Sequence, residues 1–301
     1  MNHFYFRYLL SNDPRRTVSA WGIHLRKLVH PLLIRVAPLF SRRRLVVVRR
    51  AAIPSGRPII FAATHGFKDD ALFTLLTVQR HAYLLFGSLP QFFGSSDGLS
   101  AWLNGAILVD RRDKASRHAS KEKMVRALAL GADLIYYPEG TWNKSENQLV
   151  LQLFPGIYEV AARSGALVVP VATHQEGNLC YAILGEAFDP CGYDREQGLR
   201  ELRDRMGALK YELIAGHSRA DRRTLLDGIS PQEYWQRFVQ GLLDEVDCYD
   251  PEVEANSAYI DPAITTPRQA FGHLQAIEYT PQNAFLLRRA AGFYQEREAI
   301  P

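Results

Sequence analysis

A histidine and an aspartate five residues apart are the first candidates for chemistry in this sequence. His65 directly follows the apolar run Pro58–Ala63, and Asp70 lies where the next helix should begin. Residues just beyond the carboxyl end of a strand in an open α/β sheet usually face the ligand. A turn could bring the Asp70 carboxylate to Nδ1 of His65 and leave Nε2 free to take a proton from a hydroxyl. The alternative is an aspartate that only complements a helix dipole.

Two further segments place polar residues at the ends of expected strands. In the segment 137–141, Glu139 and Thr141 follow a strand, and the glycine between them permits an unusual backbone conformation. The expected strand Ala106–Val109 leads to Arg111, whose planar guanidinium can donate two parallel hydrogen bonds to a phosphate. Taken singly, the first segment could be a tight turn and the second could be surface charge.

Together with Val169-Pro170-Val171, these blocks resemble the glycerophospholipid acyltransferase family, typified by 1-acylglycerol-3-phosphate acyltransferases. The family pattern is His-x4-Asp, a Gly…Asp-Arg block, Pro-Glu-Gly-Thr and a Val-Pro-Val-type strand, here within about residues 58–172. The resemblance implies these roles: His65 as general base, Asp70 as its orienting partner, Arg111 on the acceptor phosphate, and Glu139, Gly140 and Thr141 in substrate binding.

The resemblance also implies a reaction. A fatty acyl group would pass from acyl-CoA or acyl carrier protein directly to lysophosphatidate, giving phosphatidate, with no covalent acyl-enzyme. We expect no cofactor beyond this co-substrate, and no metal site, because no second histidine stands at ligand spacing from His65 and Asp70.

Two departures from the family pattern concern the acceptor. Trp142 and Asn143 follow the Pro-Glu-Gly-Thr block, where the family often has a basic residue and then serine. Phe154 and Pro155 stand where the family often has a lysine before glycine. Both changes remove polar or cationic contacts expected near a phosphate. A lysolipid without a phosphate, or another hydroxyl acceptor, is therefore the alternative substrate.

A serine hydrolase is a competing hypothesis. The segment Gly94–Gly98 matches the Gly-x-Ser-x-Gly nucleophile elbow, with Ser96 as nucleophile. The elbow needs a strand that ends at Ser95 and a helix that begins after Ser96. The short preceding segment opens with Pro90, which is unfavourable in a central strand.

The first fifty residues carry eleven arginines and lysines against a single aspartate, a net charge of +10 on a chain whose total is +4. Such an arm needs an anionic partner. We expect an interrupted amphipathic helix over residues 17–40, because Pro31 and Pro38 favour either a kink or two short helices. A tryptophan, aliphatic residues and cations suit a helix lying among anionic lipid headgroups. The alternative is a helix packed on the catalytic domain; nucleic acid is not expected, since no known binding module is present.

Strand and helix patterns alternate from residue 45 and predict an α/β fold, a mostly parallel twisted sheet flanked by helices, with an N-terminal amphipathic helical segment. We expect three parts: a basic membrane-interface segment over 1–50, an α/β acyltransferase domain over 51–246 and a C-terminal extension of unknown role over 247–301. Expected strands and helices lie at Leu45–Val48, Pro58–Ala63, Asp70–Val78, Ala106–Val109, Lys121–Leu130, Asp133–Tyr137, Gly156–Ser164, Leu167–Ala172, Cys180–Leu184, Arg195–Ala215 and 231–246.

Localisation follows from what the sequence lacks. We find no run of about 20 apolar residues and no signal peptide pattern, and the three cysteines form neither a zinc motif nor a disulfide framework. The largely uncharged stretch His81–Val109 contains several glycines and a proline, so we expect it to be buried in protein or to line a cavity. The sequence predicts a peripheral, monotopic protein at the cytoplasmic face of a membrane.

Overall fold

The computed structural model describes residues 8–218, apart from Ser88, Ser95 and 145–147, and a few positions between Gly228 and Gly241. The chain divides into two compact units, Met1–Tyr259 and Ile260–Pro301, and all described residues belong to the first. The expected C-terminal extension over 247–301 lies outside the described residues, as does most of the helix expected over 231–246.

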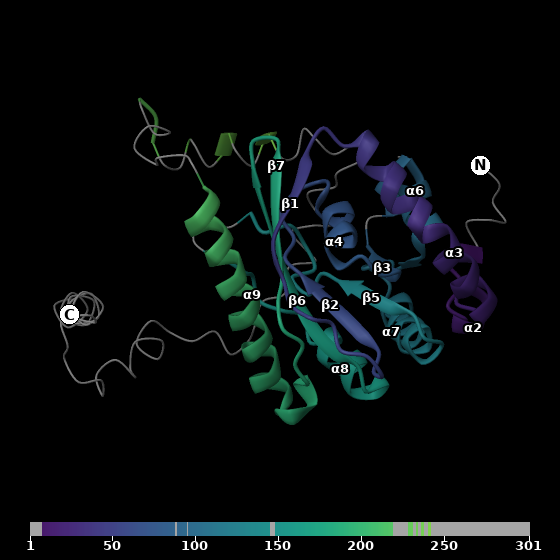
Figure 1. The fold of residues 1–301 in the computed structure, drawn as a ribbon. Helices are drawn as coiled ribbons and strands as arrows, with labels where there is room; N and C mark the ends of the chain where they lie inside the picture. Colours follow the sequence, from purple (N-terminus) through teal and green to yellow (C-terminus); the bar gives the residue numbers. More distant parts are fainter. Residues whose placement is uncertain are drawn as a thin grey trace. The chain divides into compact units, whose positions relative to one another are not determined.

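The described part of the chain is built on one seven-stranded sheet in the order β1-β7-β6-β2-β5-β3-β4 (Figure 1). Strands β2 to β6 run parallel to one another, while β7 is antiparallel to β6 and parallel to β1. The carboxyl ends of five strands therefore meet at one edge of the sheet. The strands are β1 (Arg44–Arg50), β2 (Ile59–Ala63), β3 (Ala82–Phe86), β4 (Ala106–Leu108), β5 (Asp133–Tyr136), β6 (Leu167–Glu176) and β7 (Leu179–Leu184).

Helices cover both faces of this sheet, which confirms the predicted fold class. On the central strand β2, Ile60 and Ala62 face a core shared with α7 and α8, whereas Ile59 and Phe61 face a core shared with α4, α5 and α6. A strand buried on both faces explains why its sequence is an unbroken apolar run. The helices are α4 (Asp70–Val78), α5 (Leu89–Gly94), α6 (Ser96–Asn104), α7 (Lys114–Ala129), α8 (Gly156–Ser164) and α9 (Arg195–His217).

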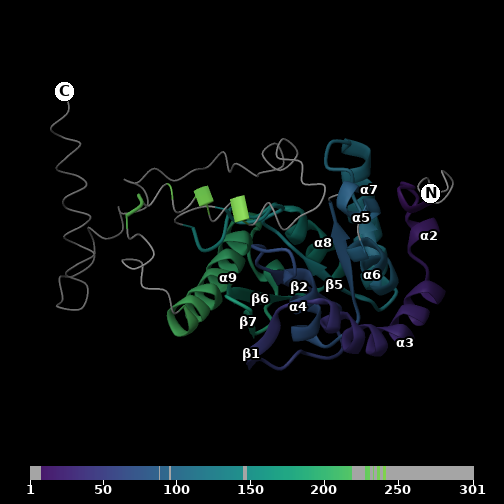
Figure 2. The same ribbon diagram turned by 90° about the horizontal axis from the view of Figure 1, so that it is seen from above.

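Strands β6 and β7 lie between α9 on one side and α4 on the other (Figures 1 and 2). The alternation of side chains along β7 produces this arrangement: Tyr181 and Ile183 pack with α9, while Cys180 packs beside Phe73 of α4. The short 3-10 helix η2 (Pro190–Gly192) connects β7 to α9. The two helices thus bring residues from distant parts of the chain to the same strands.

The N-terminal segment forms α2 (Pro14–Thr17), α3 (Ala20–Val36) and the 3-10 helix η1 (Ala37–Phe40). Helix α3 runs through Pro31 as one element, so the break expected there does not occur. Ile23 and His30, the two buried residues of α3, hold the helix against the core on the turns before Pro31. The helix gives way to η1, which has Pro38 near its start.

Several boundaries differ from those expected. Residues 44–50 form a strand of the sheet, so the sheet begins before the domain boundary placed after residue 50. Helix α7 begins at Lys114 rather than Lys121, because Asp113 caps it by accepting from two backbone N–H groups. The stretch His81–Val109 contains β3, α5 and α6 besides the predicted strand β4, and β6 extends to Glu176.

Candidate active site

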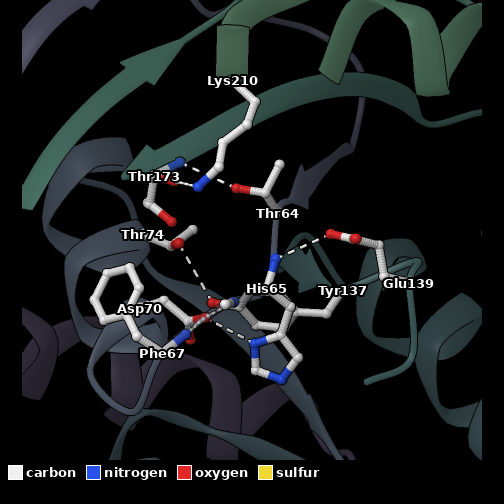
Figure 3. A network of polar contacts seen from close by, with 10 residues as sticks. Thr64, His65, Phe67, Asp70, Thr74, Tyr137, Glu139, Thr173 and Lys210 are labelled. Atoms are coloured by element: carbon white, nitrogen blue, oxygen red, sulfur yellow. Dashed lines mark hydrogen bonds and ion pairs between the residues drawn. The ribbon is translucent and has the colours of Figure 1, made fainter. Parts of the chain in front are cut away.

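His65 and Asp70 form a hydrogen-bonded pair at the carboxyl end of β2. Nδ1 of His65 lies 2.8 Å from Oδ2 of Asp70. The same oxygen accepts from the backbone N–H groups of Gly66 at 2.8 Å and Phe67 at 3.3 Å, so the turn into α4 wraps around the carboxylate (Figure 3). A carboxylate only accepts, so Nδ1 carries the proton and Nε2 is the basic nitrogen of the neutral ring.

The Nε2 side of the His65 ring is open. The side chain is 21% exposed, whereas that of Asp70 is 1% exposed. Figure 3 shows Nε2 pointing away from the polar network that holds the ring. The ring lies against Tyr137, with centroids 4.3 Å apart, and edge-on to Trp142 at 6.0 Å. A substrate hydroxyl can therefore reach a base whose orientation is already fixed.

Glu139 holds the backbone around His65. Its Oε1 accepts the N–H of His65 at 3.0 Å, and its Oε2 accepts the N–H of Leu151 at 2.8 Å. The N–H of Asn143, on the same loop, donates to the carbonyl oxygen of His65 at 2.8 Å. Burial raises the pKa of Glu139 to about 7, against the lowering effect of the two N–H donors. At 1% exposure, Glu139 lies behind His65 rather than on its open side.

Gly140 and Thr141 pack tightly in the same loop. Gly140 has φ of +71°, and a Cβ built there would lie 2.3 Å from the Phe154 ring, so only glycine fits. Thr141 is buried as well. In the structure, this block positions His65 and packs the loop, and substrate contacts from Glu139, Gly140 and Thr141 stay a prediction.

A buried lysine that the sequence pattern did not single out completes the network. Lys210 of α9 donates from Nζ to the carbonyl oxygen of Thr173 at 2.5 Å, and the N–H of Thr173 donates to Oγ1 of Thr64 at 3.1 Å (Figure 3). The stem of Lys210 is partly accessible, but its ammonium is buried, which lowers its pKa. Its neighbours in the helix, Leu209 and Leu213, belong to the buried face of α9. In the sequence, the only sign that Lys210 is buried was its position beside the apolar residues of this helix.

Arg111 lies at the same edge of the sheet, after β4. Its guanidinium packs over Gly87 at the end of β3, where an added Cβ would lie 2.2 Å from Nε. Strands β5 and β3 separate β2 from β4, which corresponds to roughly 14 Å between the strand ends. Because the Arg111 side chain turns toward β3, its guanidinium lies closer to His65 than the end of β4 does.

The Gly-x-Ser-x-Gly motif lacks the structural context that a nucleophile elbow needs. The backbone before the Gly-x-Ser-x-Gly motif is the helix α5 rather than a strand, and Ser96 begins α6. The described residues contain no group of three or more His, Cys, Asp or Glu side chains that could hold a metal ion. Within the same described residues, no helix has the length and apolar character needed to cross a membrane.

The fold and the site together define a class of protein: a mostly parallel α/β domain with a histidine–aspartate pair at the carboxyl edge of its sheet. Comparison with known families shows which domains of this class the chain is similar to. The model of the Acyltransferase family matches residues 44–174, from β1 to β6. This part of the chain is therefore similar to the Acyltransferase family, and the resemblance drawn from the four sequence blocks is confirmed. The match begins at Arg44, where the first strand of the sheet begins.

Two individual proteins are similar to this chain. A 1-acyl-sn-glycerol-3-phosphate acyltransferase of Chlamydomonas reinhardtii is 27% identical over 135 residues, which cover 44% of this chain and 39% of that protein. The crystal structure of PlsC, the 1-acyl-sn-glycerophosphate acyltransferase of Thermotoga maritima, superposes with a TM-score of 0.52 at 19% identity, covering 72% of this chain and 88% of PlsC. The chain thus matches about two fifths of the length of the curated relative, and the match to PlsC shows the fold.

Proposed function

We propose that this protein is an O-acyltransferase that moves a fatty acyl group from a thioester to the free hydroxyl of 1-acylglycerol-3-phosphate, giving phosphatidate for phospholipid synthesis. The observation that carries the proposal is the His65–Asp70 pair, whose Nε2 is open to a substrate. The names of the two similar proteins, both acyltransferases for this acceptor, support the same reaction.

The proposed reaction has one base and no covalent acyl-enzyme. Nε2 of His65 takes the proton of the acceptor hydroxyl as its oxygen attacks the thioester carbonyl carbon. The tetrahedral intermediate collapses, the carbon–sulfur bond breaks, and the leaving thiolate takes the proton back from the imidazolium. Asp70 stabilises the imidazolium while it exists and keeps the ring oriented.

In this proposal the acyl donor is acyl-CoA or acyl carrier protein. Arg111, which follows β4 on the side of β3 away from His65, binds the phosphate of the acceptor. An acceptor without a phosphate is the second candidate. Phe154 covers Gly140, and Trp142 lies edge-on to His65, so aromatic rings stand where the family often has cations. Aromatic surface beside the base favours an apolar or neutral part of a substrate.

Peripheral binding to the cytoplasmic face of an anionic membrane is part of the proposal. Helix α3 turns an apolar stripe outward, and the stripe continues into η1. Apolar surface of this kind on a helix rich in cations is typical of helices that lie in the lipid interface. The stripe consists of Trp21, Leu25, Leu28, Leu32, Val36 and Leu39.

A matrix of donors and acceptors tests the proposal. The purified full-length protein is given acyl-CoA or acyl carrier protein with lysophosphatidate, lysophosphatidylcholine or monoacylglycerol, and free thiol and lipid product are measured. We expect thiol release that depends on lysophosphatidate and matches phosphatidate formed. A preference for the neutral acceptors would establish the second candidate, and thiol release without any acceptor would favour hydrolysis.

A further inference from the structure

A cavity of about 230 Å³ lies where α2 and α3 meet β4 and α7. Strand β4 is the last strand of the described sheet, so its outer edge borders this cavity instead of another strand. Arg26 of α3, Lys123 of α7 and Trp102 of α6 contribute to its walls. None of these residues belongs to the His65 site, so the cavity needs its own explanation.

Lys123 is a buried cation without a partner among the described residues. It is 2% exposed and makes no hydrogen bond or ion pair with any of them. Burial alone accounts for the lowering of its pKa, with no carboxylate acting in the opposite direction. A buried ammonium without a counter-charge is strongly unfavourable, so such groups are normally paired or bind something.

Arg26 adds a second positive charge, and its partners among the described residues are all neutral. Its guanidinium donates to the carbonyl oxygens of Trp102 and Gly22 and to the hydroxyl of Tyr83, each at 3.3 Å. It also lies against the rings of Tyr83 and Trp102. Among the described residues, no aspartate or glutamate lines the cavity, and the buried hydroxyl of Thr17, another lining residue, has no hydrogen-bond partner.

We infer that this cavity binds a small phosphate-type anion between Lys123 and Arg26. Two cations and an unpaired hydroxyl suit an anion with several acceptor oxygens. The volume is below the roughly 300–1,000 Å³ of typical small-molecule sites, so it fits a phosphate group rather than a whole lipid. The phosphate comes either from solution or from a phospholipid headgroup.

The position of the cavity connects it to the outward face of α3. Trp21 lines the cavity and is also 69% exposed, at the start of the apolar stripe. A headgroup bound here would tie α3 to α7 and β4 at the side of the molecule that the stripe presents to lipid. Anion binding at this cavity does not depend on acyl transfer at His65.

Thermal unfolding of the full-length protein tests the inference. The unfolding temperature is measured against inorganic phosphate, with chloride at equal ionic strength as the reference. A ligand that binds only the folded state raises this temperature in a saturable way; at ten times its Kd the expected rise is about 3–6 °C. Water-soluble dihexanoyl phosphatidate and dihexanoyl phosphatidylcholine, in parallel titrations, distinguish a lipid headgroup from free phosphate.

Substitutions assign the site. Lys123→Met removes the charge at similar length, and we expect at least about a tenfold loss of phosphate affinity. Lys114→Met makes the same change at an exposed position of α7 and should keep the response. Arg111→Ala, at the His65 edge of the sheet, should keep the part of the response that Lys123→Met removes, which separates this cavity from the proposed acceptor site.

Two results would overturn the inference. One is an unfolding temperature of the unaltered protein that rises no more with any of the phosphate compounds than with chloride. The other is an equal rise in the Lys123→Met variant. If that variant does not fold, a crystal of the unaltered protein soaked in tungstate decides the matter, because an anomalous peak between Lys123 and Arg26 is required.

Discussion

At the scale of single residues, His65 is held from three directions. Asp70 fixes its ring, Glu139 accepts its backbone N–H, and Asn143 donates to its carbonyl oxygen. Asp70 lies at the turn after β2, whereas Glu139 and Asn143 belong to the loop after β5. A base fixed in this way needs no reorganisation when a hydroxyl arrives, which is the advantage of a preorganised site.

The first prediction concerns this base. His65→Ala should lower the turnover of lysophosphatidate by about 10²–10⁴, because the hydroxyl then has no positioned proton acceptor. Asp70→Asn should also lower it severely, since an amide can donate to Nδ1 and favour the wrong tautomer. Steady-state kinetics with thiol release measure both changes, and circular dichroism checks that the fold is kept.

Ser96→Ala is the matched control for these variants. In the proposed mechanism Ser96 takes no part, so its substitution should leave turnover within about twofold of the unaltered protein. A dead Ser96→Ala enzyme together with a nearly normal His65→Ala enzyme would replace the acyltransferase mechanism with the serine hydrolase.

The second prediction concerns Lys210. Its ammonium lowers the pKa of Glu139, which burial raises to about 7. Lys210→Met should therefore raise that pKa, so that Glu139 is protonated and loosens its hold on His65 at a higher pH. We expect the acidic limb of the profile of kcat/KM against pH to move to higher pH, with near-normal activity on the alkaline side.

Other charged or titratable groups also face Lys210: Asp70 on α4, Cys180 on β7 and His174 on β6. Lys210→Arg keeps the positive charge and should keep the limb in place. A uniform loss of activity at every pH in Lys210→Met, without a moved limb, would mean that Lys210 only supports the packing of α9.

At the scale of elements, α3 has two different faces. Its inner face contacts residues before the amino ends of β4 and β5: Arg26 and His30 bond to Trp102 and Asn104 before β4, and Lys27 donates to the carbonyl oxygen of Gly131 before β5. Its outer face carries the apolar stripe. The membrane interpretation and the packed-helix interpretation of this segment are therefore compatible, because they use opposite faces.

The third prediction concerns the attachment of α3 through two buried histidines. His30 and His81 lie edge to face, with ring centroids 5.8 Å apart, and His81 bonds to the Asn104 carbonyl oxygen. Burial lowers the pKa of both, that of His81 to about 4, where the nearby charges of Lys27 and Arg26 add to the effect. A lowered pKa means that folding favours the neutral ring, so this stability is present above pH 6.5 and is lost as pH falls toward 4.

For His81 alone, the expected loss between pH 7 and pH 5 is about 2 kcal/mol. Urea unfolding across this range measures it. His81→Gln keeps a donor for the Asn104 carbonyl oxygen but does not titrate, so it should flatten the fall in stability. His118→Gln, at an exposed position of α7, should not. An unchanged slope in His81→Gln would exclude this histidine as the source.

At the scale of the whole molecule, charge and apolar surface are combined in the first fifty residues. This segment carries +10 against −6 for the rest of the chain. The segment also contacts the candidate active site. Ser41 and Arg43 donate hydrogen bonds to the carboxylate of Asp69, at 2.9 and 3.1 Å, beside the turn that holds His65 and Asp70. A lipid surface bound by α3 would therefore lie next to the segment that leads into the catalytic loop.

The fourth prediction tests this surface. The double variant Leu28→Glu, Leu32→Glu places two acids on the exposed stripe and should abolish binding to vesicles that contain anionic lipid, with little change in thermal stability. Vesicle sedimentation measures the binding, which should also weaken with salt, because exposed charges are screened over about 8–10 Å.

Tyr211→Glu is the control variant, because it places an acid at an exposed hydrophobic position of α9, away from the stripe. It should bind vesicles as the unaltered protein does. Equal sedimentation of the Leu28→Glu, Leu32→Glu variant and the unaltered protein would remove α3 as the lipid-binding element.

The sequence by itself determined the features that depend on neighbours along the chain. The unbroken apolar run of β2, the bounds of α4 and the placing of His65 and Asp70 between them all follow from short-range patterns. The same patterns predicted a mostly parallel sheet. Missed elements, such as β3 and α5, lie in the stretch where apolar residues and glycines gave neither a helical nor a strand period.

Only the tertiary structure decided which side chains from different loops and helices contact one another. The strand order placed the loop after β5 beside His65, so the buried Glu139 carboxylate accepts from two backbone N–H groups. It also brought Lys210 from α9 close to that carboxylate, and it placed Lys123 and Arg26 in the walls of one cavity. These contacts join residues far apart in the chain, so their energies depend on the packing of whole elements and leave no local pattern in the sequence.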